Sequence, residues 1–183
     1  METELYQPED RAQPGSLIEL FFDPVEDFGE LVPVGEKDLS AEYRSLLAHH
    51  DHMTVTQEAW HNSLVDLHAL NERADEDFYA RESLLQRQRD GAVVQYGIMR
   101  IALVGLPEIV RLEILSRALP LGRVLIRHHL LRVVELHQLW RVNAGERLRS
   151  LLRLSGDQPA YARSAGILVD GKPAVELLEV ATL

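Results

Sequence analysis

The sequence predicts an α+β fold in which helices pack on an antiparallel β-sheet. Asp90-Gly91 and Asp170-Gly171 each separate two apolar segments. Asp-Gly in that setting indicates a hairpin, because glycine adopts positive φ without steric cost. The helical segments lie between the hairpins and do not alternate one for one with strands, which favours an antiparallel sheet over a doubly wound parallel one. The predicted hairpin strands are 79–87 with 92–104 and 161–169 with 173–180.

The remaining elements follow from caps and periodicity. A helix is expected to begin near Asp38 or Ser40, either of which can cap it. Apolar residues at helical spacing come next, namely Leu39, Tyr43, Leu46 and Leu47. Further helices are expected at 53–60, 107–117 and 122–128, and strands at 64–70 and 130–142. The strand at 130–142 is predicted from apolar residues of one parity, with a helix as the alternative: Leu130, Val134, Leu136, Trp140 and Val142.

The chain is expected to form one domain. Its 183 residues are enough to bury a core. Residues 1–37 carry scattered proline, glycine and acidic residues and are interpreted as an irregular N-terminal arm that partly packs on the core. The domain itself is then expected to occupy residues 38–183.

Composition excludes several classes of protein. The net charge of −10 and the isoelectric point near 5.2 argue against a nucleic-acid binder, which normally has a basic surface. The absence of cysteine excludes disulfides, cysteine metal sites and thiol catalysis. The N-terminus is polar and acidic, unlike a signal peptide, and no apolar segment has the ~18 residues of a membrane span. A cytoplasmic protein without a membrane partner is expected.

Glu176 is the first candidate for chemistry. On a strand it shares a face with Ala174, Leu178 and Val180. A carboxylate in an apolar row must be paired or protonated, and burial would raise its pKa toward neutrality, where it could act as an acid or base. The alternative is that this face is solvated, in which case Glu179 is equally eligible.

Arg81 is the second candidate. Its guanidinium offers a rigid fork of donors that fits a carboxylate in two-point contact. It lies on a mixed strand face with Tyr79 and Ser83. From spacing alone, a surface arginine paired with Glu82 or with a loop carboxylate is the more common arrangement, because exposed ion pairs are frequent and contribute little.

Histidines cluster at His49-His50-Asp51-His52. On a helix, His49 and His52 would lie three residues apart and could share a metal ion. Three ligands must converge for such a site, and the sequence has no His-Glu-x-x-His spacing. A helix end with polar contacts is therefore expected here rather than a metal site. Nucleophile-elbow and glycine-rich phosphate motifs are absent as well.

Four short segments, taken together and in this order, resemble the chorismate pyruvate-lyase (4-hydroxybenzoate synthase) family, in a divergent branch. The resemblance covers roughly residues 44–182. Each motif is weak alone, and their order and spacing are more specific. Leu119 departs from the family by replacing the threonine of a Thr-Pro-Leu-Gly-Arg turn, and the segment that follows Met53 is also built differently. The matching segments are Leu46-Leu47 to Met53-Thr54, Tyr79-Ala80-Arg81-Glu82, Leu119-Pro120-Leu121-Gly122-Arg123, and Gly171-Lys172-Pro173 to Glu176.

The resemblance implies a buried ligand site under helical flaps and a set of site residues. The substrate arginine falls on Arg81 and the glutamate on Glu176. Met53 would pack on the ligand ring, and the backbone at Leu121-Gly122 would meet a ligand carboxylate. Arg123 is a further candidate for attracting an anionic substrate.

The activity that the resemblance implies is elimination of pyruvate from chorismate to give 4-hydroxybenzoate, without a cofactor. Arg81 would anchor a carboxylate, and Glu176 would bind the 4-hydroxyl and assist proton movement. The alternatives are a lyase that yields another hydroxybenzoate isomer and a non-catalytic, sensor-type domain that binds a small aromatic acid. Chorismate and hydroxybenzoate are thus the expected small-molecule partners, and a monomer or small homo-oligomer is expected.

Overall fold

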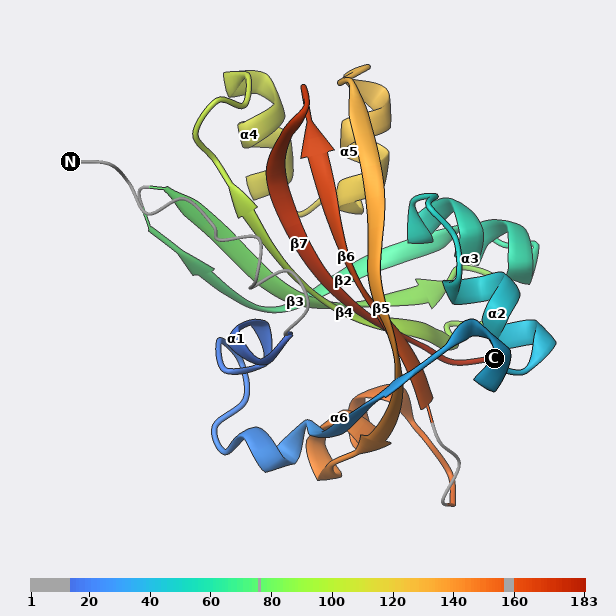
Figure 1. The fold of residues 1–183 in the computed structure, drawn as a ribbon. Helices are drawn as coiled ribbons and strands as arrows, with labels where there is room; N and C mark the ends of the chain where they lie inside the picture. The colour runs from blue at the N-terminus through green and yellow to red at the C-terminus, as the bar shows by residue number, and fades with distance from the viewer. Residues whose placement is uncertain (1–13, 76, 157–159) are drawn as a thin grey trace.

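A single antiparallel sheet of seven strands organises the chain (Figure 1). The computed structural model describes residues 14–75, 77–156 and 160–183. Helices cover both faces of the sheet, so the predicted α+β class is confirmed. The strand order is β1-β5-β6-β7-β4-β3-β2. The elements are α1 (Gly15–Ile18), η2 (Val25–Asp27), β1 (Gly29–Val34), η3 (Glu36–Asp38), α2 (Ala41–Leu47), α3 (Met53–His61), β2 (Val65–Ala74), β3 (Phe78–Arg87), β4 (Val93–Ala102), α4 (Glu108–Leu115), α5 (Leu121–Arg127), β5 (Arg132–Ala144), α6 (Glu146–Leu152), β6 (Ala160–Val169) and β7 (Lys172–Ala181).

Both predicted hairpins form, as β3–β4 and β6–β7. At the second turn Asp170 has φ 51° and Gly171 has φ 77°. Two consecutive residues with positive φ characterise the type I′ turn, whose twist matches that of the flanking strands. The two hairpins join through antiparallel pairing of β4 with β7, in which Gly97 lies opposite Glu179. Strands far apart in sequence therefore meet at the centre of the sheet.

The N-terminal segment contributes more than an arm to the fold. Residues Gly29–Val34 form β1, an edge strand paired with β5. Leu17, Phe22 and Phe28 are buried in the core. The expected boundary near residue 37 therefore does not separate an arm from the domain within the described residues. Residues 1–13 of the expected arm lie outside them.

The sheet has two faces, and the candidate site lies on only one of them, the cavity face. The face that packs against α1 and α6 is the other one, which we call the opposite face. Phe22, Phe28 and Tyr96 pack edge to face or tilted in this core. Glu82 is fully buried here and accepts hydrogen bonds from the Tyr96 hydroxyl at 2.8 Å and from Arg147 of α6. The buried carboxylate thus fastens α6 to the sheet.

The cavity face packs against α2, α3, α4 and α5. Two apolar clusters form on it, one under α4 and α5 and one under α2 and α3. Helix α2 begins after Ser40, whose hydroxyl accepts from the Tyr43 amide at 3.4 Å, so the predicted cap is confirmed. Helix α3 ends at Asn62, which adopts the left-handed conformation (φ 45°) common at helix ends. The space between the two helix pairs contains the candidate site.

A β-bulge changes the faces of β5. Register shifts between Leu136 and Gln138, so residues of one parity point to different faces on either side of the shift. Val134 packs in the cluster under α4 and α5, whereas Val142 packs in the core under α1 and α6. The expectation that Val134 and Val142 share a face is therefore wrong, and the bulge is the reason.

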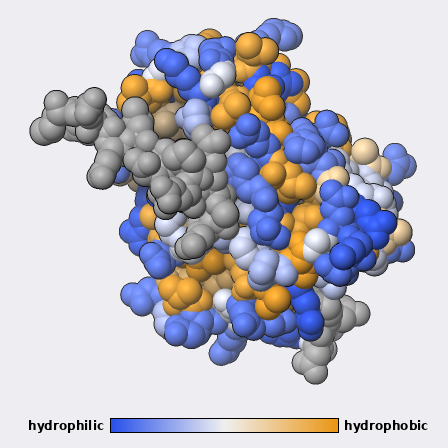
Figure 2. Space-filling view, viewed as in Figure 1, coloured by the Kyte–Doolittle hydropathy of each residue, from blue (hydrophilic) through white to orange (hydrophobic). Residues whose placement is uncertain are grey.

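The surface mixes hydrophilic and apolar residues (Figure 2). Among the described residues, large exposed apolar side chains include Val104, Ile109 and Leu112 near α4 and Leu131 at the start of β5. No helix in the ranges that the structure describes combines the length and apolar character required to span a bilayer.

Gly145 should be essential for the contact between η2 and α6. A Cβ at this position would lie 2.2 Å from the Glu26 carbonyl oxygen, a backbone atom that cannot rotate away. We expect Gly145→Ala to lower the free energy of unfolding by about 1–3 kcal/mol, as overpacking does. Urea denaturation measures this.

Gly15→Ala is the matched control, because a Cβ at Gly15 would have no neighbour within 4 Å. It should leave stability unchanged or raise it slightly, since alanine favours helix. Equal stability of the two variants would contradict the close approach at Gly145.

Candidate functional site: a polar cavity between the sheet and helices α3 and α5

A cavity lies over the cavity face, between the central strands and the first turns of α3 and α5. Its walls are mainly apolar, and its polar groups come from separate elements. Arg81 belongs to β3, Gln95 to β4, Arg163 to β6 and Glu179 to β7. The lining residues are His52, Met53, Thr54, Leu67, Arg81, Ser83, Leu85, Gln95, Gly97, Ile98, Met99, Pro120, Leu121, Gly122, Val134, Arg163, Ile167, Leu177 and Glu179.

Strand register fixes the relation between Arg81 and Glu179. Glu179 lies opposite Gly97 on one side and Arg163 on the other. Arg81 lies opposite Met99, two residues farther along β4 than Gly97. Strand spacing of ~4.8 Å and a rise of ~3.4 Å per residue place the Cα atoms of Arg81 and Glu179 roughly 12 Å apart. Their side chains can approach opposite ends of one small molecule.

Arg81 is buried but poorly satisfied. Its side chain is only 2% exposed. Its Nη1 and Nη2 groups reach the carbonyl oxygens of Ile114 and Leu119 at 3.5 Å, and its Nε has no hydrogen-bond partner among the described residues. Burial lowers the pKa of Arg81, while the neighbouring Tyr79 and Glu72 act against that shift. An arginine remains protonated despite such a shift, so a positive charge faces the cavity.

Glu72, the acidic residue near Arg81, already has other hydrogen-bond partners. Glu72 accepts from the Tyr79 hydroxyl at 2.5 Å and from Arg117 at 2.7 Å. Burial and the hydrogen bond to Glu72 raise the pKa of Tyr79 to about 12, so its hydroxyl stays neutral. In the part of the chain that the structure describes, Arg81 therefore has no direct ion pair. Its expected pairing with Glu82 does not occur either, because Glu82 lies on the opposite face.

The glutamate in the cavity is Glu179, not Glu176. Glu179 is 8% exposed and lines the cavity, whereas Glu176 lies on the opposite face and accepts from Arg100 Nε at 2.5 Å. The two residues point to opposite sides of β7, as residues three apart on a strand must. The expected orientation was therefore wrong: the apolar row with Glu176 faces away from the cavity, and Glu179 is not solvated.

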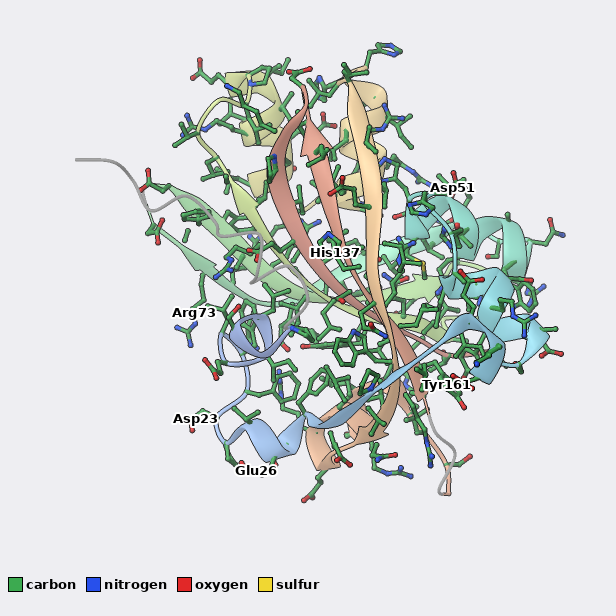
Figure 3. All side chains as sticks on the ribbon, in the orientation of Figure 1. Asp23, Glu26, Asp51, Arg73, His137 and Tyr161 are labelled. Carbon is green, nitrogen blue, oxygen red and sulfur yellow. The ribbon has the colours of Figure 1, made fainter. Side chains whose placement is uncertain are left out.

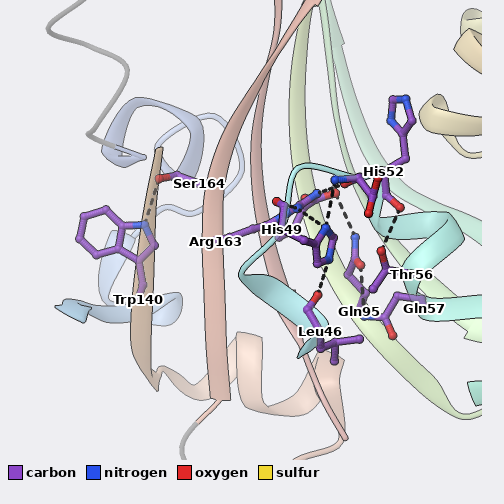
Figure 4. A network of polar contacts seen from close by, with 11 residues as sticks. Leu46, His49, His52, Thr56, Gln57, Gln95, Trp140, Arg163 and Ser164 are labelled. Carbon is purple, nitrogen blue, oxygen red and sulfur yellow. Dashed lines mark hydrogen bonds and ion pairs between the residues drawn. The ribbon is translucent and has the colours of Figure 1, made fainter. Parts of the chain in front are cut away.

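Arg163 holds Glu179 in place and belongs to the polar network with His49 and Gln95 that Figure 4 shows. The guanidinium is fully buried, and its Nε donates to Glu179 Oε2 at 2.8 Å. Gln95 donates to the other carboxylate oxygen at 3.4 Å, and Gln57 of α3 donates to the Gln95 side-chain oxygen at 3.3 Å. The carboxylate is consequently a fixed hydrogen-bond acceptor at the wall of the cavity.

The other expected site residues divide into two groups. Met53 at the start of α3 and Leu121 and Gly122 at the start of α5 line the cavity. A Cβ on Gly122 would lie 3.1 Å from the His52 ring, so a small residue is needed there. Arg123 is not among the lining residues; it forms an ion pair with Glu58 of α3 and thereby ties α3 to α5.

The clustered histidines make separate contacts. His49 donates to the Leu46 carbonyl at 2.8 Å, His50 contacts the Val134 carbonyl at 3.1 Å, and His52 accepts from Arg132 Nε at 2.9 Å. Burial is the main cause that lowers the pKa of both His49 and His52. The described residues contain no group of three potential metal ligands.

Sequence reasoning missed the roles of Arg163, Gln95 and Gln57 entirely. Gln95 and Arg163 lie in strand segments that are otherwise largely apolar, Gln57 lies between Thr56 and Glu58, and no motif marks any of the three. Their signal is mutual: all three are buried, Gln57 donates to Gln95, and Gln95 and Arg163 each donate to Glu179. Strand pairing brings Gln95, Arg163 and Glu179 together, and the packing of α3 adds Gln57.

Several solved structures share this fold at low sequence identity. PhnF from Mycobacterium smegmatis matches with a TM-score of 0.53 and 12% identity, over 93% of this chain and 93% of that chain. The ligand-binding domain of a protein assigned to the GntR family of transcriptional regulators, from Bordetella bronchiseptica, matches with a TM-score of 0.51 and 14% identity, over 64% of this chain and 85% of that chain. A Staphylococcus aureus gene product matches with a TM-score of 0.50 and 14% identity, over 74% and 90% respectively.

No protein-family profile matches the sequence, and no curated protein matches it significantly. The identities of 12–14% establish similarity of fold alone. The chain thus has the chorismate lyase-like α+β fold seen in ligand-binding domains of this kind.

Proposed function

We propose that this chain is a ligand-binding domain that holds a small organic acid in the cavity without converting it. The observation that carries the proposal is Arg81, a buried cation beside a cavity whose Nε has no hydrogen-bond partner among the residues that the structure describes. A buried charge without a partner is costly. A ligand carboxylate would supply two charge-assisted hydrogen bonds in the geometry that guanidinium prefers.

The other end of the cavity favours a ligand with a neutral donor. Glu179 presents acceptor oxygens, but its charge is already balanced by Arg163. A hydroxyl can donate to such a carboxylate without adding another buried charge. Met53, Met99 and Leu177 supply apolar walls between the two ends. An aromatic hydroxy acid such as 4-hydroxybenzoate meets these requirements.

Binding without turnover is favoured for two reasons. Glu179 is held by Arg163 and Gln95, so it is less suited to accept and release a proton than an uncommitted base. The fold also resembles a structure described as a ligand-binding domain. Chorismate pyruvate-lyase activity is the second candidate, supported by Arg81, Met53, Leu121 and a glutamate on one cavity.

Arg81→Met should separate binding from stability. Methionine fills a similar space without the charge, so we expect the ligand-free variant to be more stable by about 1–3 kcal/mol. The same variant should bind 4-hydroxybenzoate about 10²-fold more weakly, because the two-point contact is lost. Urea denaturation and isothermal titration calorimetry measure the two effects. Arg81→Lys should restore only part of the affinity, since an ammonium lacks the planar fork.

Two comparisons sharpen this test. Phenol, which lacks the carboxylate, should not distinguish wild type from Arg81→Met, whereas benzoate should. Arg127→Met removes an exposed arginine that pairs with Glu113 outside the cavity and should leave binding unchanged. An Arg81→Met variant that binds 4-hydroxybenzoate with wild-type affinity would contradict the carboxylate anchor.

Incubation with chorismate decides between the two candidate functions. The proposal predicts no pyruvate above the spontaneous background, measured by coupled lactate dehydrogenase, with or without prior chelator treatment. Enzyme-dependent pyruvate that disappears in both Arg81→Met and Glu179→Gln would establish the lyase. Glu176→Gln is the matched control, because its side chain faces away from the cavity.

A further inference from the structure

Arg163 connects the cavity wall to the loop that covers it. Besides Glu179, its guanidinium contacts the loop between α2 and α3, residues 48–52, which we call the cover loop. Nη1 donates to the His49 carbonyl at 3.1 Å and lies 3.3 Å from His49 Nδ1, and Nη2 donates to the Asp51 carbonyl at 3.1 Å. One buried cation therefore specifies the positions of both a strand carboxylate and the cover loop.

The C-terminal end of the cover loop forms part of the cavity wall. His52 lines the cavity, its ring packs against Gly122 of α5, and its Nε2 accepts from Arg132 of β5. Met53 follows directly as the first residue of α3. Figure 3 shows Asp51 at the outer side of this region, in keeping with its exposed side chain. Displacement of the loop would move His52 and Met53, and with them one wall of the cavity.

We infer that Arg163 is a positioning residue for this ligand site, that it couples Glu179 to the cover loop, and that the coupling requires His49 to be neutral. The expected effect on ligand affinity rests on the proposed ligand-binding function. The expected effect on the cover loop concerns the ligand-free protein and does not depend on that function.

The hydrogen bonds of His49 require one tautomer. Nε2 lies 2.8 Å from the Leu46 carbonyl oxygen, which can only accept, so Nε2 carries the proton. Nδ1 then accepts from the Asp51 amide at 3.1 Å and faces Arg163 Nη1 at 3.3 Å. A second proton on Nδ1 would oppose both an amide hydrogen and a guanidinium. Protonated His49 is therefore incompatible with the observed loop.

The surroundings of His49 favour the neutral ring overall. Burial is the largest effect and Arg163 from β6 adds to it, whereas the hydrogen bond to the Leu46 carbonyl, Asp51 from the cover loop and Glu179 from β7 act in the other direction. The pKa of His49 is thus lowered from its ordinary 6.5. A lowered histidine pKa leaves stability unaffected above the unfolded-state value and reduces it as pH falls through that value toward the folded-state pKa. Acidification below about pH 6.5 should accordingly favour the open loop.

Nuclear magnetic resonance on ligand-free protein tests the coupling directly. Long-range ¹H–¹⁵N spectra should show His49 as the Nε2-protonated tautomer at pH 7.5. On acidification, the His49 ring and the amides of residues 48–53 should titrate with one midpoint below the ordinary histidine value. In His49→Asn, whose Oδ1 can accept from Arg163 without titrating, that shared transition should vanish. Loop amides that retain it, or a ring that titrates without them, would refute the inference.

The effect on binding is a separate measurement with 4-hydroxybenzoate as the probe. Its carboxylate stays ionised between pH 7.5 and 5.5, so a change in affinity reports on the protein. Between pH 7.5 and 5.5 the affinity of the wild-type protein should fall by up to about 10-fold. This is the largest change that a single histidine can cause when it is neutral in the closed loop and has its ordinary pKa in the open loop. His49→Asn should lose the part of this pH dependence that His49 causes, and the remainder is expected from His52, which lines the cavity and whose pKa burial also lowers. A pH dependence equal to that of wild type would contradict the role of His49. His50→Asn, in the same loop but outside the cavity, should retain the wild-type pH dependence.

Arg163→Lys separates positioning from overall folding. Lysine keeps a charge beside Glu179 but cannot reach the strand and both loop carbonyls as a fork. We expect a folded protein with faster hydrogen exchange at residues 48–53 and unchanged exchange in α6, which contacts the opposite face. Equal protection of the cover loop in this variant and wild type would overturn the inference. Failure of 4-hydroxybenzoate to bind any variant would instead count against the proposed function, because the ligand-free measurements do not depend on it.

Discussion

The buried ion pair between Arg163 and Glu179 is the interaction on which the cavity face depends. It joins two adjacent central strands, and neither side chain is exposed enough to be solvated freely. Removing two charges from water is expensive, and only additional hydrogen bonds make such a pair tolerable. Here the loop carbonyls of His49 and Asp51 and the amide of Gln95 provide them. The pair therefore requires the cover loop, and the loop conformation follows from the pair.

Arg81 and Arg163 lie on the same face of the sheet and differ in their pairing with a carboxylate. Arg163 is neutralised by Glu179, whereas Arg81, within the described ranges, hydrogen-bonds to two carbonyl oxygens at 3.5 Å and forms no ion pair. The lining residues consequently carry two guanidinium groups and one carboxylate, a local excess of positive charge in a chain whose net charge is −10. Local charge of this kind attracts an anion although the protein as a whole repels it. A bound anion would also stabilise the fold by mass action.

Local signals in the sequence predicted the hairpins and most helices, because turns and caps depend on neighbouring residues, whereas the placement of Arg81 at a ligand site came from the family resemblance. They could not predict which side of β7 faces the cavity. Helices cover both faces of the sheet, so the row with Glu176 and the row with Glu179 are equally apolar. The hairpin turn does not resolve the choice, since register shifts between Ile167 and Leu168. Strand β1 and helix α6 also escaped prediction, because neither has a strong turn or cap signal.

The ion pair of Glu179 with Arg163 affects whether this glutamate could act as the acid or base of a lyase. A catalytic acid or base must change its protonation during each cycle, and its surroundings must tolerate both states. Protonation of Glu179 would leave the Arg163 charge buried and unpaired, and the loop contacts of Arg163 would then stabilise a cation without its counterion. A hydroxyl that merely donates to Glu179 imposes no such change. The pairing of this carboxylate with Arg163 is therefore one reason why we propose recognition of a ligand, and not its turnover, for this cavity.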